Sequence, residues 1–261
     1  MNHEVKEHIK NALKKGIRID GRKLEELREI KIETGFLATA EGSAKIIFGD
    51  AEVLAGVKMA IEKPYPDTPE DGVLMVNSEL LPLSSPDFES GPPSIESIET
   101  ARVIDRGIRE SKAFNTKTLC LEKGEKVWTV AIDVVPINYD GNLIDIGGFA
   151  ALAALKNSRF PKLEEDGTVD YHTITDKTLE LQKLPIPITI YKIGDILIVD
   201  PTAEEEKAVD ARLTVTVLDD EKVCALQKGG DHPLSMKDVE QMVDLAIKTS
   251  KTLRAKLSEV N

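Results

Sequence analysis

The sequence predicts an α+β fold in which two similar halves, each a set of strands followed by a long helix, are related by a pseudo-twofold axis within a single domain. Two observations support this prediction. Strand-type runs followed by a helix-type run occur twice, around residues 30–110 and 120–257. The length of 261 residues suits one large domain or two fused halves. We therefore expect the halves over about residues 20–115 and 116–258.

An N-terminal helix over about residues 2–15 is expected to precede the first half. Four apolar residues recur on one helical face, namely Val5, Ile9, Ala12 and Leu13. Gly16 is a typical residue at which such a helix ends. Apolar runs separated by turn residues then predict strands at 30–32, 44–48, 53–61 and 73–76. The Gly49-Asp50 pair predicts a tight hairpin between the second and third of these strands.

Two loops and a helix complete the first half. Residues 62–72 and 82–93 are rich in proline, which cannot continue a helix or a central strand, so we expect surface loops there. Ser94 follows directly and is a suitable N-cap residue. It predicts a helix over residues 94–110.

The second half is expected to contain more strands and two helices. Strand-type runs lie at residues 119–121, 127–138, 185–191, 196–200, 213–218 and 223–226. Residues 146–155 have no polar face, which predicts a helix buried on all sides. The chain closes with a helix that begins at Ser235, where Asp238 forms a variant of the capping box.

The composition excludes several classes of protein. Hydrophobic residues make up 41% and charged residues 31%, which is typical of a soluble globular protein. The longest uncharged stretch, residues 146–155, is shorter than the about 20 residues of a bilayer span. The polar N-terminus shows no secretory signal, and Cys120 and Cys224 form no CxxC motif. We therefore expect a cytoplasmic protein.

The balance of charge limits the partners. The 34 basic and 46 acidic residues give a net charge of −12, which repels polyanions on average. A role with RNA would therefore need a local basic stripe or a basic surface supplied by a partner.

Several standard sites are absent from the sequence. Neither a GxxxxGK[ST] loop nor a strand-linked GxGxxG occurs. The histidines, His3, His8, His172 and His232, have no metal-ligand spacing to each other or to the cysteines. We expect neither a bound metal nor a cofactor.

Arg102, Arg106 and Arg109 form a stripe on the helix expected over 94–110. Their spacing of i, i+4 and i+7 places them within a wedge of roughly 60°. One interpretation is a solvated face knitted by ion pairs to Glu99, Asp105 and Glu110. The other is an anion-binding stripe, because a like-charged i,i+4 pair costs stability unless an anion lies between its members.

An acidic cluster lies between two of the expected strands, within VDPTAEEEKAVDA (199–211). Its members are Asp200, Glu204, Glu205, Glu206 and Asp210. Converging carboxylates can hold Mg²⁺ or act as general acid and base. The alternative is an ordinary polar hairpin connection, since surface carboxylates are common.

Four sequence words in order resemble the RNase PH family over about residues 10–257. They are RIDGRK (18–23), GSAKIIFGDAEVLAGVK (42–58), TARVIDRGIRES (100–111) and VDPTAEEEKAVDA. Within this family the chain is most similar to the non-catalytic RNase PH-like subunit of the archaeal exosome. KPYPDTPEDG (63–72), ARVIDRGIRESKA (101–113) and VWTVAIDVV (127–135) are characteristic of that branch.

The resemblance implies an RNase PH-like fold and a role in 3′→5′ RNA degradation. Active members use phosphate to cleave the terminal phosphodiester, and a Gly-[Ser/Thr]-Arg turn at a helix N-terminus grips that phosphate. The corresponding segment here, YDGNLIDIGGFAA (139–151), has no Arg, Lys, Ser or Thr between Asp140 and Gly148. It places Asp140 and Asp145 where phosphate would lie. We therefore expect a subunit without catalytic residues.

One alternative remains within the same resemblance. Asp210 matches the family's catalytic carboxylate, and Glu204 stands where active members have Asp. The chain would then itself be a phosphorolytic 3′→5′ exoribonuclease that uses these two residues with Mg²⁺.

The resemblance also implies partners. It implies a heterodimer with a catalytic RNase PH-like subunit, three copies of which form a hexameric ring, together with RNA-binding cap subunits and single-stranded RNA. Arg102 and Arg106 match positions that reach across the dimer interface to the RNA backbone. Arg109 joins this RNA-binding set on its helical geometry alone.

Overall fold

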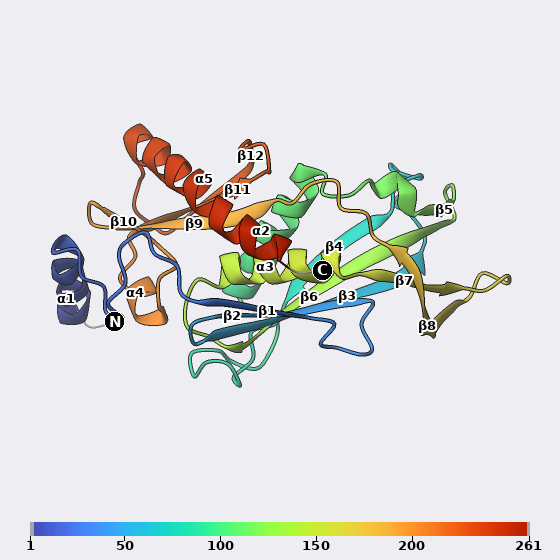
Figure 1. Ribbon diagram of the computed structural model, residues 1–261, viewed down its shortest axis with the longest axis horizontal. Helices are drawn as coiled ribbons and strands as arrows, with labels where there is room; N and C mark the ends of the chain where they lie inside the picture. Colours follow the sequence, from blue (N-terminus) through green and yellow to red (C-terminus); the bar gives the residue numbers. More distant parts are fainter. Residues whose placement is uncertain (1–2, 260–261) are drawn as a thin grey trace.

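A buried helix lies at the centre of the computed structural model, which describes residues 3–259 (Figure 1). Helix α3 (Leu143–Lys156) has every residue from Leu143 to Leu155 buried, so the expected helix without a polar face is confirmed. It begins three residues earlier than expected, because the expectation covered only the uncharged run and Asp145 is in fact buried in the first turn of the helix. Asn142, directly before the helix, has a left-handed backbone with φ 58°. A six-stranded sheet packs on one side of α3 and a four-stranded sheet on the other.

The six-stranded sheet contains most of the first part of the chain. Its strands are β1 (Ile30–Thr34), β2 (Gly42–Phe48), β3 (Ala51–Glu62), β4 (Val73–Ser78), β5 (Cys120–Glu122) and β6 (Lys126–Asn138). Their order is β1-β2-β3-β6-β4, with β5 also on β6. All neighbours are antiparallel except β4 and β6, which run parallel. Phe48 pairs with Ala51 across Gly49-Asp50, so the expected hairpin is confirmed.

The four-stranded sheet is formed by the later part of the chain. Its strands are β9 (Ile186–Ile193), β10 (Ile196–Val199), β11 (Ala211–Val217) and β12 (Val223–Gly229). They lie in the order β10-β9-β11-β12, and all neighbours are antiparallel. The strands expected from the apolar runs are therefore present, with shifted ends.

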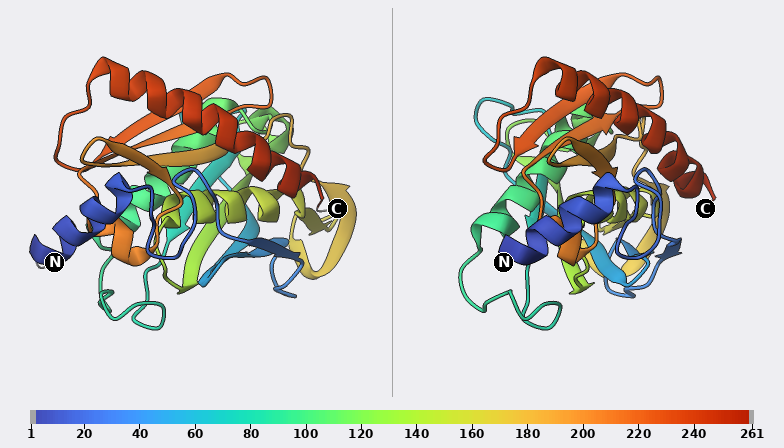
Figure 2. Two further views of the ribbon diagram at one scale, coloured as in Figure 1. Left: turned by 60° about the vertical axis from the view of Figure 1, so that its left-hand side comes forward. Right: turned by 90° about the vertical axis from the view of Figure 1, so that its left-hand side faces the viewer.

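The described residues contain four further α-helices: α1 (His3–Lys14), α2 (Ile95–Ser111), α4 (Ala203–Glu206) and α5 (Met236–Ser258). A short 3-10 helix, η1 (Thr116–Leu119), lies directly before β5. Helix α2 packs on β4, β12 and α3, while α5 covers the outer face of the second sheet at β9 and β11 (Figure 2). Ser94 and Ser235 both accept a hydrogen bond at the helix start, as expected. Across residues 3–259, no helix is long and apolar enough to span a bilayer.

Helix α1 packs against the edge of the second sheet rather than on the main core. Ile9 and Leu13 lie in a small apolar cluster with Tyr191, Ile193 and Ile198. This confirms the expected apolar face for those two residues. Residue 2, the expected start of the helix, lies outside the described residues, as does the side chain of Val5.

The boundary expected near residue 115 does not coincide with the point at which the chain passes from the first sheet to the second. Strands β5 and β6 follow that boundary in sequence, yet they pair within the first sheet, where β6 lies between β3 and β4. The two sheets also differ in their number of strands. A repeat in element order could not reveal this, because strand pairing joins segments that are distant in sequence.

A hairpin of β7 (Arg159–Leu163) and β8 (Val169–Thr178) was not expected from the sequence. It projects from the body of the protein on the right of Figure 1. Most of its residues are exposed. Strand β8 buries neither face, so nothing requires its apolar and polar residues to alternate and the sequence carries no signal for it. Strand β7 buries Phe160 and Pro161, but it is too short to show a pattern.

The glycines of α3 allow the second sheet to approach the helix. A Cβ atom at Gly148 would lie 2.5 Å from the side chain of Pro187 on β9. Such a contact cannot form without moving the backbone, since the surrounding core is close-packed. Helix α3 therefore needs glycine at this position to lie between the sheets.

A buried carboxyl group links α3 to β9. Asp145 accepts hydrogen bonds from the backbone N–H of Thr189, at 2.8 Å, and from its hydroxyl, at 2.6 Å. The Thr189 hydroxyl also lies 2.8 Å from that of Thr214 on β11. Burial raises the pKa of Asp145 to about 7, although the bonds from Thr189 oppose this shift.

We predict that this group makes stability depend on pH. The folded-state pKa of Asp145 lies above the ordinary value of 3.8, so the folded chain takes up a proton that the unfolded chain does not bind. Relative to Asp145→Asn, the wild-type free energy of unfolding should therefore rise as the pH falls from about 8 to about 5. Urea unfolding curves measure this difference. The exposed Asp176→Asn is the control, and parallel curves for wild type and Asp145→Asn would contradict the assignment.

Candidate functional site

The turn before α3 is held by the side chain of Asn142, which does not cap the helix. Its Nδ2 donates to Asp200 Oδ1 at 2.9 Å, and its Oδ1 accepts from the hydroxyl of Tyr191 at 3.1 Å. The Asn142 side chain is therefore directed into the protein. The backbone donors at the start of α3 are left for other acceptors, which is the arrangement that attracts anions.

The anion nearest to this helix start belongs to the chain itself. Glu206, at the end of α4, accepts a long hydrogen bond from the backbone N–H of Asn142 at 3.4 Å. Its other carboxylate oxygen accepts from the hydroxyl of Tyr139. Burial, followed by the charge of Glu206, raises the pKa of Tyr139 far above its ordinary value, so the phenol keeps its proton for this bond. Glu206 therefore places a negative charge at the start of α3.

More carboxylates surround the same place. A hollow of about 360 Å³ opens in front of the turn, between α2, α3 and α4. We call it the acidic hollow; its charged lining residues are Asp87, Glu96, Glu99, Glu206, Lys207 and Arg212. Burial raises the pKa of Glu96, and the negative charge of the nearby Glu206 adds to this shift.

The two cations of the acidic hollow already have carboxylate partners. Arg212 lies 2.8 Å from Glu99, and Lys207 lies 3.2 Å from Glu204 and 3.9 Å from Asp87. An entering phosphate would meet several carboxylates and no unpaired cation among the described lining residues. The electrostatics of the hollow therefore oppose phosphate binding.

Two acids expected at the phosphate position lie elsewhere. Asp145 is buried against β9, on the core side of α3. Asp140 accepts from Arg28 at 2.9 Å and from the backbone N–H of Ala203 at 3.2 Å. Neither lines the acidic hollow. The expectation that these two residues repel phosphate is wrong in detail, because the chain path directs both carboxylates away from the hollow.

The negative charge of the hollow comes instead from Asp87, Glu96, Glu99 and Glu206. Glu206 belongs to the acidic cluster noted in the sequence and Glu99 was expected to pair on α2, whereas Asp87 and Glu96 were not singled out. Glu96 and Glu99 lie in the first turns of α2, and Glu206 lies in the EEE run of α4. The acidic run itself was visible in the sequence. Its contact with α2 and α3 was not visible, because the acidic run is distant from both in the sequence; Glu206 and Asn142, for example, are 64 positions apart.

A buried ion network holds α4 in place and explains the RIDGRK word. Arg18, which is almost fully buried, forms an ion pair with Glu205 of α4. Arg28 and Arg22 both bind the buried Asp200, at 2.6 Å and 3.0 Å. Burial alone would raise the pKa of Asp200, but the bonds from Arg28 outweigh it and lower the pKa. Arg28, Asp200 and Glu205 therefore have structural roles.

The other two acids of the cluster do not converge on the acidic hollow. Asp210 lies 2.9 Å from Lys6 and 3.5 Å from Lys10 of α1, and accepts from the N–H of Gly194. Although burial opposes ionisation, these contacts lower the pKa of Asp210 to about 2. Glu204 is exposed and pairs with Lys207. Within residues 3–259, no group of three His, Cys, Asp or Glu side chains could hold a metal ion.

The three arginines of α2 divide into two kinds. Arg109 makes two hydrogen bonds to Asp105, at 2.6 and 2.9 Å, and one to the carbonyl of Leu74. Arg102 and Arg106 are exposed, and neither forms an ion pair with any residue in the described part of the chain. Of the ion pairs expected along this helix face, Asp105–Arg109 is present. Glu99, the expected partner of Arg102, pairs with Arg212 instead.

All three arginines line one broad hollow of about 730 Å³ beside α2. We call it the arginine hollow; its apolar lining includes Val76, Ile95 and Ile98. Ile95 is 87% exposed. Because β4 and β12 are sheet edges and both pack against α2, the arginine hollow lies on a surface with two open strand edges.

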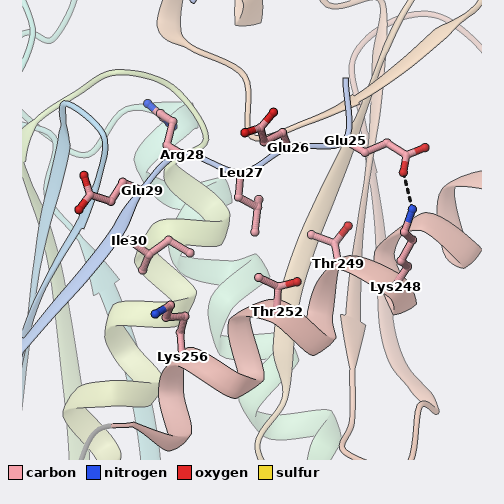
Figure 3. A pocket seen from close by; sticks show the side chains of 10 residues that line it. All are labelled: Glu25, Glu26, Leu27, Arg28, Glu29, Ile30, Lys248, Thr249, Thr252 and Lys256. Carbon is pink, nitrogen blue, oxygen red and sulfur yellow. Dashed lines mark hydrogen bonds and ion pairs between the residues drawn. The ribbon is translucent and has the colours of Figure 1, made fainter. Parts of the chain in front are cut away.

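Another hollow, of about 460 Å³, lies between residues 25–30 and α5 (Figure 3). Leu27 points into it toward Thr249 and Thr252, and Glu25 pairs with Lys248 at its rim. The guanidinium of Arg28 is bound to Asp200 rather than directed to a ligand here. These contacts hold the N-terminal segment on α5.

Comparisons with known proteins agree with this arrangement. The 3′ exoribonuclease family matches through its domain 1 at residues 26–161 and its domain 2 at residues 183–249. These ranges divide the chain between the two sheets, not near residue 115.

Similar proteins cover nearly the whole chain. The exosome complex component Rrp42 of Pyrococcus abyssi is 44% identical over 258 residues, which are 98% of this chain and 94% of the relative. That of Archaeoglobus fulgidus is 42% identical over 255 residues, which are 98% of this chain and 96% of the relative.

Two solved structures share the fold. The "archaeoglobus fulgidus exosome with RNA bound to the active site" matches with a TM-score of 0.91 and 42% identity, over 97% of both chains. An "Archaeal exosome core" matches with a TM-score of 0.87 and 38% identity, over 98% of this chain and 96% of that one. The expected RNase PH-like α+β fold is therefore confirmed, and the chain belongs to the 3′ exoribonuclease (RNase PH) family.

Proposed function

We propose that this chain is a non-catalytic subunit of an archaeal-type exosome ring that degrades RNA in the 3′→5′ direction. It structures the active site of a catalytic RNase PH-like partner and contributes contacts to the RNA backbone. The relatives named exosome complex component Rrp42, and the similar chain in an exosome with RNA at its active site, support this proposal.

The observation that carries the non-catalytic assignment is the position of Glu206. Phosphorolysis needs inorganic phosphate beside the RNA 3′ end, so its site must offer positive charge and free N–H donors. Here the donor of Asn142 binds Glu206, and the acidic hollow has no unpaired cation among its described lining residues. The chain therefore lacks the electrostatic means to recruit phosphate.

The alternative, an active exoribonuclease that uses Asp210 and Glu204, has less support. The carboxylate of Asp210 holds Lys6 and Lys10 of α1, which is a structural role. Neither residue lines the hollow in front of α3.

Arg102 and Arg106 are the proposed RNA-backbone contacts. Two unpaired guanidinium groups one helical turn apart repel each other, and a phosphodiester between them relieves this repulsion. Arg109 completes the proposed RNA-binding set with a smaller direct contribution, since Asp105 already satisfies much of its charge.

The proposed partners follow the same surface. A catalytic RNase PH-like subunit would pack beside α2, where apolar Ile95 and Ile98 are exposed next to the arginines and two sheet edges are open. Three such heterodimers would form a hexameric ring, to which RNA-binding cap subunits attach in the cytoplasm. The chain has a net charge of −12, so binding of RNA requires local positive charge, which Arg102 and Arg106 would supply.

We predict that the chain alone releases no nucleoside diphosphates from RNA and phosphate, whereas the ring reconstituted with its catalytic partner does. Within that ring, Asp210→Asn should leave turnover near the wild-type rate, because loss of a true catalytic acid or base lowers rates by about 100-fold or more. Lys6→Gln/Lys10→Gln breaks the same ion pairs and is the matched control. Diphosphate release by the chain alone, or a turnover loss specific to Asp210→Asn, would refute the assignment.

We predict that Arg102→Glu/Arg106→Glu weakens RNA binding by the assembled ring. Each lost phosphate contact should reduce the slope of log affinity against log salt by about 0.7 for a single strand. Fluorescence anisotropy at several salt concentrations, without phosphate so that RNA is not degraded, measures both quantities. Arg159→Glu/Lys162→Glu, on the projecting hairpin, is the charge-matched control. If the ring assembles and its affinity for RNA is unchanged, the proposed RNA contacts are wrong and the subunit is purely architectural.

A further inference from the structure

A separate hollow of about 460 Å³ lies between the loop after β3 and the turn after α2. We call it the loop hollow. Among its lining residues are Tyr65 and Asp71 of the loop, Leu74 of β4, and Lys112, Phe114 and Lys117 beyond α2. Arg109 lines both this hollow and the arginine hollow, so the two lie next to each other along α2.

The walls of the loop hollow are fixed by hydrogen bonds. The backbone N–H of Gly72 donates to the carbonyl of Thr116 at 2.9 Å, and the Thr116 hydroxyl donates to Asp71 at 2.9 Å. Within the loop, the N–H of Thr68 donates to the carbonyl of Tyr65 at 3.1 Å. A ligand would therefore enter a largely preformed cavity, which lowers the entropic cost of binding.

The floor of the loop hollow is apolar, and an aromatic ring stands at its rim. Leu74, Ile108 and Phe114 are each less than a tenth exposed. Tyr65 is 60% exposed and lies near enough to Arg109 to affect its pKa, after the larger effect of Asp105. A flat ring beside an apolar floor is a suitable surface for stacking a nucleobase.

The rim of the loop hollow is positively charged. Lys112 and Lys117 are exposed, and neither forms an ion pair with any residue in the described part of the chain. Lys112 has a left-handed backbone, φ 54°, and its N–H caps α2 through the carbonyl of Arg109, which fixes its position beyond the helix end. Asp71 is the acidic side chain of the lining, and it is bound by Thr116. Two unpaired lysines in a chain of net charge −12 match a polyanionic ligand.

We propose that the loop hollow binds one nucleoside of single-stranded RNA, with the base against Tyr65 and the apolar floor and the adjoining phosphates on Lys112 and Lys117. This site rests on the proposed function, because it extends the RNA path that begins at Arg102 and Arg106. The site takes any base, since stacking and phosphate contacts do not read sequence.

The test compares variants of the assembled ring in buffer without phosphate, using a fluorescein-labelled single-stranded RNA. Tyr65→Ala and Lys112→Gln/Lys117→Gln should each weaken binding by about fivefold or more, and only the lysine variant should flatten the salt dependence. Tyr171→Ala is the exposed control for the tyrosine variant, and Lys248→Gln/Lys251→Gln is the charge-matched control for the lysine variant. Photocrosslinking with 4-thiouridine RNA, read by mass spectrometry, should label peptides containing Tyr65 or Phe114.

Each outcome decides the proposal. If Arg102→Glu/Arg106→Glu weakens RNA binding and the loop-hollow variants do not, this site is wrong and the proposed function stands. If neither set changes binding, both fail. If the loop-hollow variants reduce ring assembly, measured by native mass spectrometry, and leave RNA affinity unchanged, the hollow holds a side chain of a neighbouring subunit and the proposal is overturned.

Discussion

The buried carboxylate of Asp200 is the contact on which the rest of the site depends. It binds Arg22 and Arg28 from the N-terminal segment and Asn142 from the turn before α3. Asp200 itself has a left-handed backbone, φ 47°, at the end of β10. A buried charge must be paired where it lies, so these bonds hold three distant segments in one geometry. The neighbouring pair of Arg18 and Glu205 then sets the position of α4.

The position of α4 decides what chemistry the chain can perform. Because Glu205 faces inward to Arg18, the next residue, Glu206, faces the start of α3 and Tyr139. A helix N-terminus is a place that attracts anions, and here the anion is built into the protein. The chain thus has the fold of the family, and the hollow in front of α3 is lined by carboxylates from α2 and α4.

Helix α2 connects the two surfaces of interest. Its first turns supply Glu96 and Glu99 to the acidic hollow, and its exposed side carries Arg102 and Arg106. Glu99 lines both hollows, and its ion pair is with Arg212 rather than with Arg102. The acidic hollow thus contains no unpaired cation among its described lining residues, while the arginine hollow contains two, Arg102 and Arg106, beside Glu99, Asp105 and Glu110. This difference supports the proposal of a subunit that contacts RNA and leaves its cleavage to a partner.

The sequence by itself determined the α+β class, the buried helix α3, the caps at Ser94 and Ser235 and the one-sided arginine stripe, because apolar periodicity and capping are local properties. The tertiary structure decided which strands share a sheet, that Asp145 faces the core while Glu206 faces the helix start, and that Arg109 is paired while Arg102 is not. Those outcomes depend on contacts between segments far apart in the chain, such as Glu99 with Arg212. The sequence also carried no sign of β8, because this exposed strand has no apolar pattern. The spacing of residues along the chain reveals neither the long-range contacts nor the exposed strand.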